Sequence, residues 1–194
     1  MEKEDGELFW RRLGSKAGPE LPLFEVRFDD MEHPESGDVL SRLVLESVDW
    51  VNLVALTESG ESVMVRQYRF GVGYPTLETP GGMVDPGEDS LTAARRELAE
   101  ETGFTGGEWT YLGAVEPNPA FHDHLCHHWL AEGVRQTRAP ENSGGEHIRV
   151  ELLTEDALRT AVQDGTIKHA LALSVLSRVF DLWPRPFAHD RPSA

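Results

Sequence analysis

Three glutamates with helical spacing are the residues best suited to chemistry in this sequence. Glu97, Glu100 and Glu101 lie at positions i, i+3 and i+4 of a predicted helix over residues 89–102, which places their carboxylates within about 100° of arc. Carboxylates spaced in this way repel one another, and the helix dipole disfavours anions near its C-terminal end. Because hard divalent cations bind several oxygen ligands, the spacing indicates a metal-binding face.

The residues around this triplet also suit a metal-binding site. Arg96 lies one turn before Glu100 and can orient that carboxylate. Ahead of the helix, residues 79–82 read Thr-Pro-Gly-Gly, where backbone carbonyls and amides can approach a ligand without side-chain obstruction. The alternative for a bare glutamate triplet is a solvated acidic face on a surface helix.

The hydrophobic pattern predicts the elements that must position these residues. Asp89 or Ser90 can cap the helix and Gly103 can end it. Further helices are expected from Thr154 and over 168–182, stopped by Pro184, and residues 1–36 read as an irregular or weakly extended segment. Surface loops are expected over 71–75 and 137–146. Strands are expected over 23–28, 39–48, 51–56, 62–69, 109–115, 127–132 and 147–153. This order of elements predicts an α+β fold.

Composition excludes several classes of protein. The 194 residues carry a net charge of −16, which argues against nucleic-acid binding through phosphate contacts. No apolar run reaches the roughly 18 residues of a membrane span, and the acidic N-terminus lacks the pattern of a secretory signal. The single Cys126 cannot form an intramolecular disulfide, which suits a reducing cytoplasm. An acidic chain can still bind a phosphorylated ligand through a divalent metal.

The complete spacing around the glutamates resembles the signature of a known family. Gly82 is followed after five residues by Glu88, then after seven by Arg96 and Glu97, and the pattern continues through Gly103. It is similar to the Nudix box over 23 residues without a departure. The resemblance implies an α/β/α sandwich with a mixed sheet, a loop–helix–loop box, and Mg²⁺ or Mn²⁺ as cofactor.

The same resemblance implies roles for the box residues. Glu97 and Glu101 correspond to metal ligands, and Glu100 to a further ligand or a base. Arg96 corresponds to the residue that orients these acids, and Glu88 to a structural or outer box residue.

The flanking segments narrow the resemblance. Residues 65–69 and 77–82, Pro119, and the stretches 145–151 and 164–170 are similar to ADP-ribose and nucleoside-diphosphate-sugar pyrophosphatases. The likeness covers about residues 20–182. It implies a Mg²⁺-dependent hydrolase that splits the pyrophosphate bond of ADP-ribose or a related nucleoside diphosphate sugar into a nucleoside monophosphate and a sugar phosphate.

By that likeness, Gly81 offers its carbonyl to a metal, Met83 lines the substrate pocket and Arg69 contacts the diphosphate. Arg42 is a weaker candidate for the diphosphate contact, reaching across a dimer. Glu146 corresponds to a mobile carboxylate that binds metal or activates water, and its alternative is a plain acid of a surface loop.

One departure leaves the substrate open. Residues 118–124 do not show the substrate-contacting acid in its usual place, although Asp123 is near. GDP-sugars, FAD and NADH therefore remain alternative substrates, and a Nudix-derived module that binds a ligand without catalysis is a further alternative, as is a purely structural domain. Either Trp50 or Phe121 is available to stack on the base. The histidines at 122, 124, 127 and 128 give only a weak zinc signal, because adjacent strand residues point to opposite faces.

These observations define the expected organisation. We expect an N-terminal β-rich segment over 1–47, the Nudix domain over 48–183 and a tail over 184–194. In similar pyrophosphatases the N-terminal strands join a homodimer, so a homodimer is expected here. The expected partner is a small nucleoside diphosphate, with neither nucleic acid nor membrane involved.

Overall fold

The computed structural model of the chain describes residues 8–141 and 147–183. The chain divides after Val48 into two compact units, and residues 116–125 belong with the first of them. Each unit is described by itself. None of the described helices combines the length and apolar content needed to cross a membrane.

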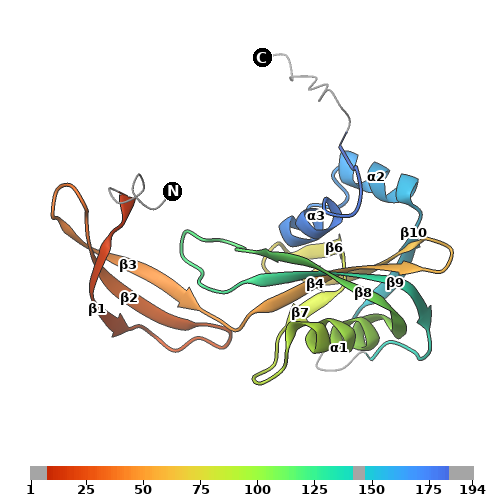
Figure 1. Cartoon of the computed structure of the whole chain (residues 1–194), viewed down its shortest axis with the longest axis horizontal. Coiled ribbons are helices and arrows are strands. Elements are labelled where there is room, and N and C mark those ends of the chain that lie inside the picture. Colours follow the sequence, from red (N-terminus) through yellow and green to blue (C-terminus); the bar gives the residue numbers. More distant parts are fainter. Residues whose placement is uncertain (1–7, 142–146, 184–194) are drawn as a thin grey trace, which may run out of the picture. The chain divides into compact units, whose positions relative to one another are not determined.

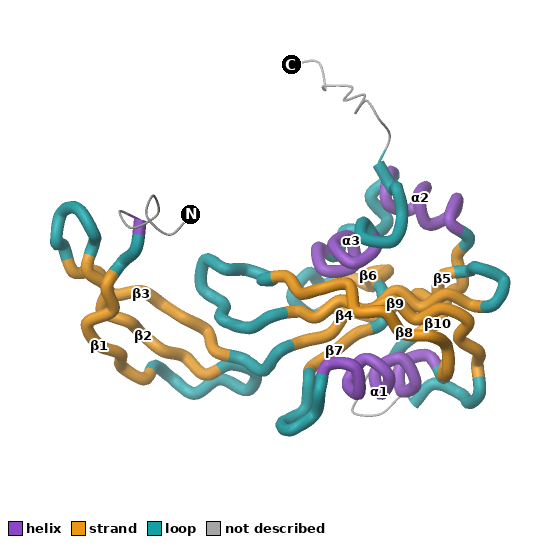
Figure 2. Tube along the Cα trace, viewed as in Figure 1, coloured by secondary structure: helices purple, strands orange, loops and turns teal. Residues whose placement is uncertain are grey.

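The first unit is built on an antiparallel sheet of β1 (Arg11–Ala17), β2 (Glu25–Glu32) and β3 (Val39–Glu46), in that order (Figure 2). The backbone N–H of Leu45 donates to the carbonyl of Phe121 at 2.7 Å, which attaches residues 116–125 to β3. The sequence pattern predicts an irregular or weakly extended stretch here and does not indicate β1 as a strand. All seven of its residues are exposed, so it has no buried alternation from which a strand could be recognised.

The second unit contains a mixed sheet. Its central strands are ordered β10-β5-β4-β9-β8, with β6 paired to β5 and β7 paired to β4. β4 and β9 run parallel, whereas the other strand pairs described in this sheet are antiparallel. The strands are β4 (Trp50–Thr57), β5 (Ser62–Arg69), β6 (Tyr74–Glu78), β7 (Gly81–Met83), β8 (Phe104–Val115), β9 (Cys126–Gln136) and β10 (Arg149–Leu153).

The alternation of β4 separates two apolar layers. Val51, Leu53 and Ala55 pack with α1 (Ser90–Thr102) on one face. Val54, on the opposite face, packs with α2 (Glu155–Gln163) and α3 (Ala170–Leu176). Figure 1 shows α1 on one side of the sheet and the other two helices across it. The predicted α+β class, an α/β/α sandwich with a mixed sheet, is confirmed.

Local signals set the ends of α1. The Asp89 carboxylate accepts from the backbone N–H groups of Leu91 and Thr92, both at 3.0 Å, which satisfies donors that have no partner inside the helix. Gly103 ends the helix with φ of 74°, in the left-handed region. Both predicted ends of this helix are confirmed, and the side chain of Thr154 caps α2 as expected.

Several predicted elements were wrong in extent, among them a helix and a loop. The expected helix over 168–182 ends at Leu176, and the chain continues through turns in which Arg178 N–H donates to the carbonyl of Val175. The Arg178 side chain donates to the carbonyls of Leu112 and Ala114 in β8, a tertiary contact that local periodicity does not contain. The loop expected over 71–75 gives way to β6 at Tyr74.

Candidate active site

The glutamate face of α1 lies beside strand β7. Glu101 is 6% exposed, and its Oε2 accepts a hydrogen bond from the backbone N–H of Gly81 at 2.9 Å. The helix is fixed on the sheet by its other side, where Ala94 and Leu98 are fully buried. The structure therefore brings the predicted glycine segment and the predicted acids together from two separate elements.

Both glycines of β7 occupy positions where a side chain does not fit. A Cβ on Gly82 would collide with the carboxylate of Glu97, and one on Gly81 would collide with the backbone carbonyl of Val51. Gly81 is also paired with Asn52 of β4, whose amide donates to the carbonyl of Pro80 at 3.2 Å. The absence of side chains in β7 is therefore what allows the acids to approach its backbone.

Arg96 connects the acids to one another and to β7. Its Nη1 donates to Glu97 Oε1 at 2.8 Å and to Glu100 Oε2 at 3.2 Å. Its Nη2 donates to the carbonyl of Met83 at 2.8 Å and to Glu88 Oε2 at 3.0 Å, and its Nε donates to Glu88 Oε1 at 3.2 Å. This arrangement agrees with an orienting role for Arg96.

This network holds more negative charge than positive charge. The hydrogen bonds from Arg96 hold the pKa of Glu88 below its usual value, and the same pair raises the pKa of Arg96. One guanidinium contacts the carboxylates of Glu88, Glu97 and Glu100, with Asp85 at 3.8 Å. A single positive charge does not balance this group of acids, so the site retains a negative field.

The donor set fits a hard divalent cation. It consists of carboxylate oxygens from Glu97, Glu100 and Glu101 beside the half-buried backbone of two glycines, and it carries excess negative charge. Among residues 8–141 and 147–183, no three acidic, histidine or cysteine side chains converge closely enough to hold an ion by themselves. Mg²⁺ does not need such a cage, because it is commonly bound by one or two carboxylates together with water and substrate phosphates.

Arg69 belongs to a second charged group, at the end of β5. Its guanidinium makes a two-pronged contact with Glu78, at 3.0 Å and 2.7 Å. Glu78 is 1% exposed, and His169 Nδ1 lies 3.6 Å from its Oε2. Burial raises the pKa of Glu78, but the hydrogen bond from Arg69 and the nearby charge of His169 outweigh it, so the pKa of Glu78 lies below its ordinary value.

Sequence reasoning did not single out Glu78 or His169. β6 is exposed at its start and buried only at Leu77 and Glu78, so the sequence carried no burial pattern that marked this acid. Burial also lowers the pKa of His169. The guanidinium of Arg69 remains 42% exposed beyond this pair, so contact with a ligand is compatible with its position.

The other predicted site residues fall in different places. The side chain of Met83 is exposed while its carbonyl accepts from Arg96. Arg42 stacks over the ring of Trp10 in the first unit, with 5.4 Å to the ring centroid. Glu146 lies outside the described residues. The remaining candidates are divided between the units, with Trp50, His127 and His128 in the second and Phe121, His122, Asp123 and His124 in the first.

Comparisons with known proteins also point to the Nudix family. A family model described as the NUDIX domain matches residues 48–173. The ADP-ribose pyrophosphatase of Bacillus subtilis (strain 168) is 32% identical over 139 residues, covering 71% of this chain and 75% of that protein. The methanol dehydrogenase activator of Bacillus methanolicus is 31% identical over 142 residues, covering 71% of this chain and 75% of that protein.

Two further similarities complete the comparison. The ADP-ribose pyrophosphatase of Mycobacterium tuberculosis (strain ATCC 25618 / H37Rv) is 35% identical over 120 residues, covering 61% of this chain and 58% of that protein's length. A crystal structure of an ADP compounds hydrolase has a TM-score of 0.76 at 22% identity, covering 88% of this chain and 91% of that one, which shows a shared fold. With the box residues assembled at β7 and α1, and a family model that spans most of the sequence, the chain belongs to the Nudix hydrolase family.

Proposed function

We propose that this protein hydrolyses the pyrophosphate bond of ADP-ribose or a related nucleoside diphosphate sugar, with Mg²⁺ as cofactor and Mn²⁺ as a substitute. The products are AMP, or another nucleoside monophosphate, and a sugar phosphate. The names of the relatives from Bacillus subtilis and Mycobacterium tuberculosis support this substrate class. The enzyme is proposed to work in the cytoplasm.

The observation that carries the proposal is the assembly of Glu97, Glu100 and Glu101 against the glycine strand, two of them held by one arginine and the third by the strand's backbone. Arg96 holds Glu97 and Glu100 at 2.8 Å and 3.2 Å, while Gly81 N–H fixes Glu101 at 2.9 Å. Oxygen donors held in this way, with an excess of negative charge, favour a divalent cation over a salt-bridged surface. A solvated acidic face would not require a glycine opposite Glu97.

In the proposed mechanism each group has one task. Glu97 and Glu101, with the carbonyl of Gly81, hold the metal, and Arg96 keeps the acids in register. When bound, the divalent ion neutralises the diphosphate oxygens and lowers the pKa of water. Glu100 or Glu146 accepts the proton from the attacking water.

Two further residues position the substrate. Arg69 binds the diphosphate from the end of β5, with its guanidinium already oriented by Glu78. Met83 lines the pocket next to the carbonyl that Arg96 holds. These contacts would fix the phosphates relative to the metal ligands.

The direct test is incubation with ADP-ribose and Mg²⁺, with AMP release read by chromatography. A panel of GDP-sugar, FAD and NADH run in parallel separates the proposed substrate class from the other Nudix activities. Preferential release of AMP from ADP-ribose would support the proposal. Hydrolysis of another member of the panel with ADP-ribose left intact would overturn it.

A substitution tests the metal assignment within the same assay. Glu101→Gln keeps an oxygen that accepts from Gly81 N–H but removes the charge. We expect Mg²⁺-dependent hydrolysis to be lost while the circular dichroism spectrum and the melting temperature stay close to those of the wild type. Full activity in this variant would refute the role of Glu101 as a metal ligand.

We also propose that the first unit mediates a homodimer. Its small sheet exposes several large apolar side chains, among them Leu13, Phe28, Val39, Leu40 and Leu43. Apolar side chains gathered on one small sheet favour burial against a partner. Sedimentation equilibrium should give twice the mass of the chain, and a monomer at micromolar concentration would contradict the proposal.

A further inference from the structure

A small hollow lies on the side of α1 away from the glutamates. Its volume is about 230 Å³, and it is lined by residues of the helix and of β8: Arg95, Leu98, Thr105, Gly106, Gly107 and Trp109. Each helical residue turns by about 100° around the helix axis. The mean direction of Arg95 and Leu98 therefore differs by roughly 140° from the mean direction of the three glutamates. The hollow is therefore a separate site on the same helix.

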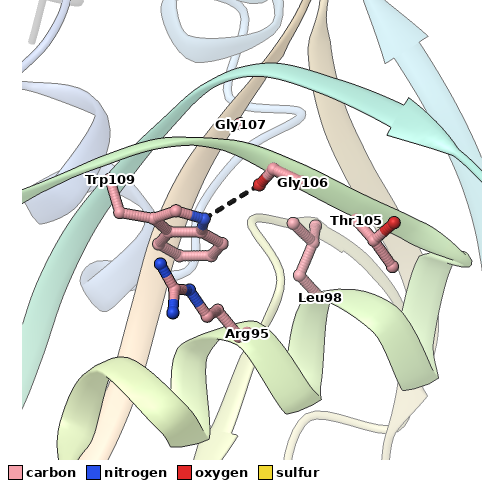
Figure 3. Close-up of a pocket in the computed structure, with 6 residues that line it drawn as sticks. All are labelled: Arg95, Leu98, Thr105, Gly106, Gly107 and Trp109. Carbon is pink, nitrogen blue, oxygen red and sulfur yellow. Dashed lines mark hydrogen bonds between the residues drawn. The ribbon is translucent and has the colours of Figure 1, made fainter.

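One wall of the hollow is a fixed aromatic ring. The indole Nε1–H of Trp109 donates to the carbonyl of Gly106 at 2.9 Å, which holds the plane of the ring (Figure 3). Gly106 and Gly107 both have positive φ, at 81° and 77°, so side chains are disfavoured there. A Cβ on Gly106 would meet nothing within 4 Å, which shows that this part of the rim is open.

Arg95 places a guanidinium at the rim of the hollow. Its guanidinium carbon lies 5.6 Å from the centroid of the Trp109 ring, and in Figure 3 it sits beneath the indole while Leu98 and Thr105 form the far side of the hollow. Within the described ranges, no carboxylate lies within ion-pair distance of Arg95. In a chain with a net charge of −16, an arginine that stacks on an aromatic ring and has no acidic partner among the described residues is available to an anion.

From this geometry we infer that the hollow is a binding site for a nucleoside monophosphate. The indole suits a planar ring, and the guanidinium suits a phosphate. The volume is below the roughly 300–1,000 Å³ of pockets that enclose a drug-sized ligand, so the base would enter and the phosphate would stay at the rim with Arg95. The inference does not depend on the proposed hydrolysis.

AMP is also a product of the proposed reaction, so the test follows a signal from Trp109 itself rather than the total binding of AMP. AMP is titrated into the full chain in EDTA, and the indole N–H resonance of Trp109, assigned with Trp109→Phe, is followed by ¹H–¹⁵N NMR. We expect a saturable shift with a dissociation constant of about 1 mM or tighter. Adenosine and ribose 5-phosphate, each lacking one half of the ligand, should bind more weakly.

A matched pair of variants isolates the guanidinium. Arg95→Gln replaces an exposed guanidinium of the helix. It should raise the dissociation constant for AMP by about tenfold or more, because a charge-assisted hydrogen bond is lost. Arg159→Gln removes an arginine from α2 that already has acidic partners, and it should leave the shift unchanged. An unmoved Trp109 resonance, equal binding in Arg95→Gln, or adenosine binding as tightly as AMP would each overturn the inference.

Discussion

Replacing Arg96 with glutamine should destabilise the protein far more than replacing a typical surface arginine. The guanidinium contacts Glu88, Glu97 and Glu100 and also donates to the carbonyl of Met83. In Arg96→Gln, these carboxylates keep their mutual repulsion and lose the cation that offsets it. The connection between α1 and the end of β7 is lost as well.

The expected magnitude follows from how shielded each pair is. The side chains of Glu88 and Glu97 are 12% and 14% exposed, whereas that of Glu100 is 40% exposed. An exposed ion pair contributes about 0–1 kcal/mol, and removing one partner of a fully buried pair costs about 3–5 kcal/mol. Because the contacts of Arg96 lie between these limits, we expect the free energy of unfolding to fall by about 2–3 kcal/mol at pH 7.

The same interaction predicts a dependence on pH. Hydrogen bonds from Arg96 hold the pKa of Glu88 in the folded protein below its ordinary value. A carboxyl whose folded pKa is depressed contributes stability above its unfolded pKa, and this contribution is lost as the pH falls through the folded pKa. The difference in stability between wild type and Arg96→Gln should therefore be largest above about pH 5 and shrink below about pH 4.5.

Urea unfolding followed by tryptophan fluorescence at several pH values measures this difference. Arg159→Gln is the matched control, since its partners Glu155 and Asp156 are 53% and 94% exposed, and it should change stability by less than about 1 kcal/mol. If Arg96→Gln cost no more than this control, or if its effect did not shrink at low pH, the reasoning about the network would be refuted.

Two further substitutions test neighbouring contacts. Gly82→Ala places a Cβ against the carboxylate of Glu97. We expect kcat for ADP-ribose to fall by about tenfold or more, because the carboxylate is displaced. The melting temperature should change little, because that carboxylate is the end of a flexible side chain. Glu78→Gln removes the buried charge that pairs with Arg69; urea unfolding at neutral pH should show a loss of about 1–3 kcal/mol, because the half-exposed guanidinium can be rehydrated.

Elements with local signals could be predicted from the sequence, and elements defined by distant partners could not. The ends of α1 follow from Asp89 and Gly103, because a cap is satisfied within a few residues of the chain. β1 has exposed side chains throughout and is defined by its hydrogen bonds to β2. The premature end of α3 likewise coincides with the anchoring of Arg178 on β8.

The candidate site likewise combines local relations, which the sequence predicted, with long-range contacts, which it did not. Helical spacing predicted that the glutamates share a face and that Arg96 reaches Glu100, since these relations lie within one helix. The contact of Arg96 with the carbonyl of Met83 and the group around Glu78 join residues from different elements. No periodicity in the sequence contains these contacts, so they required the structure.

Gly82 shows how a long-range contact can nevertheless leave a trace in a local pattern. The spacing from Gly82 to Glu97 is part of the box, yet the two residues belong to different elements, a strand and a helix. The structure supplies the reason, because a side chain at position 82 would occupy the space of the Glu97 carboxylate. A glycine at a fixed distance before a helical acid therefore indicates that the acid packs against the backbone there, and that the motif describes a contact as well as a sequence.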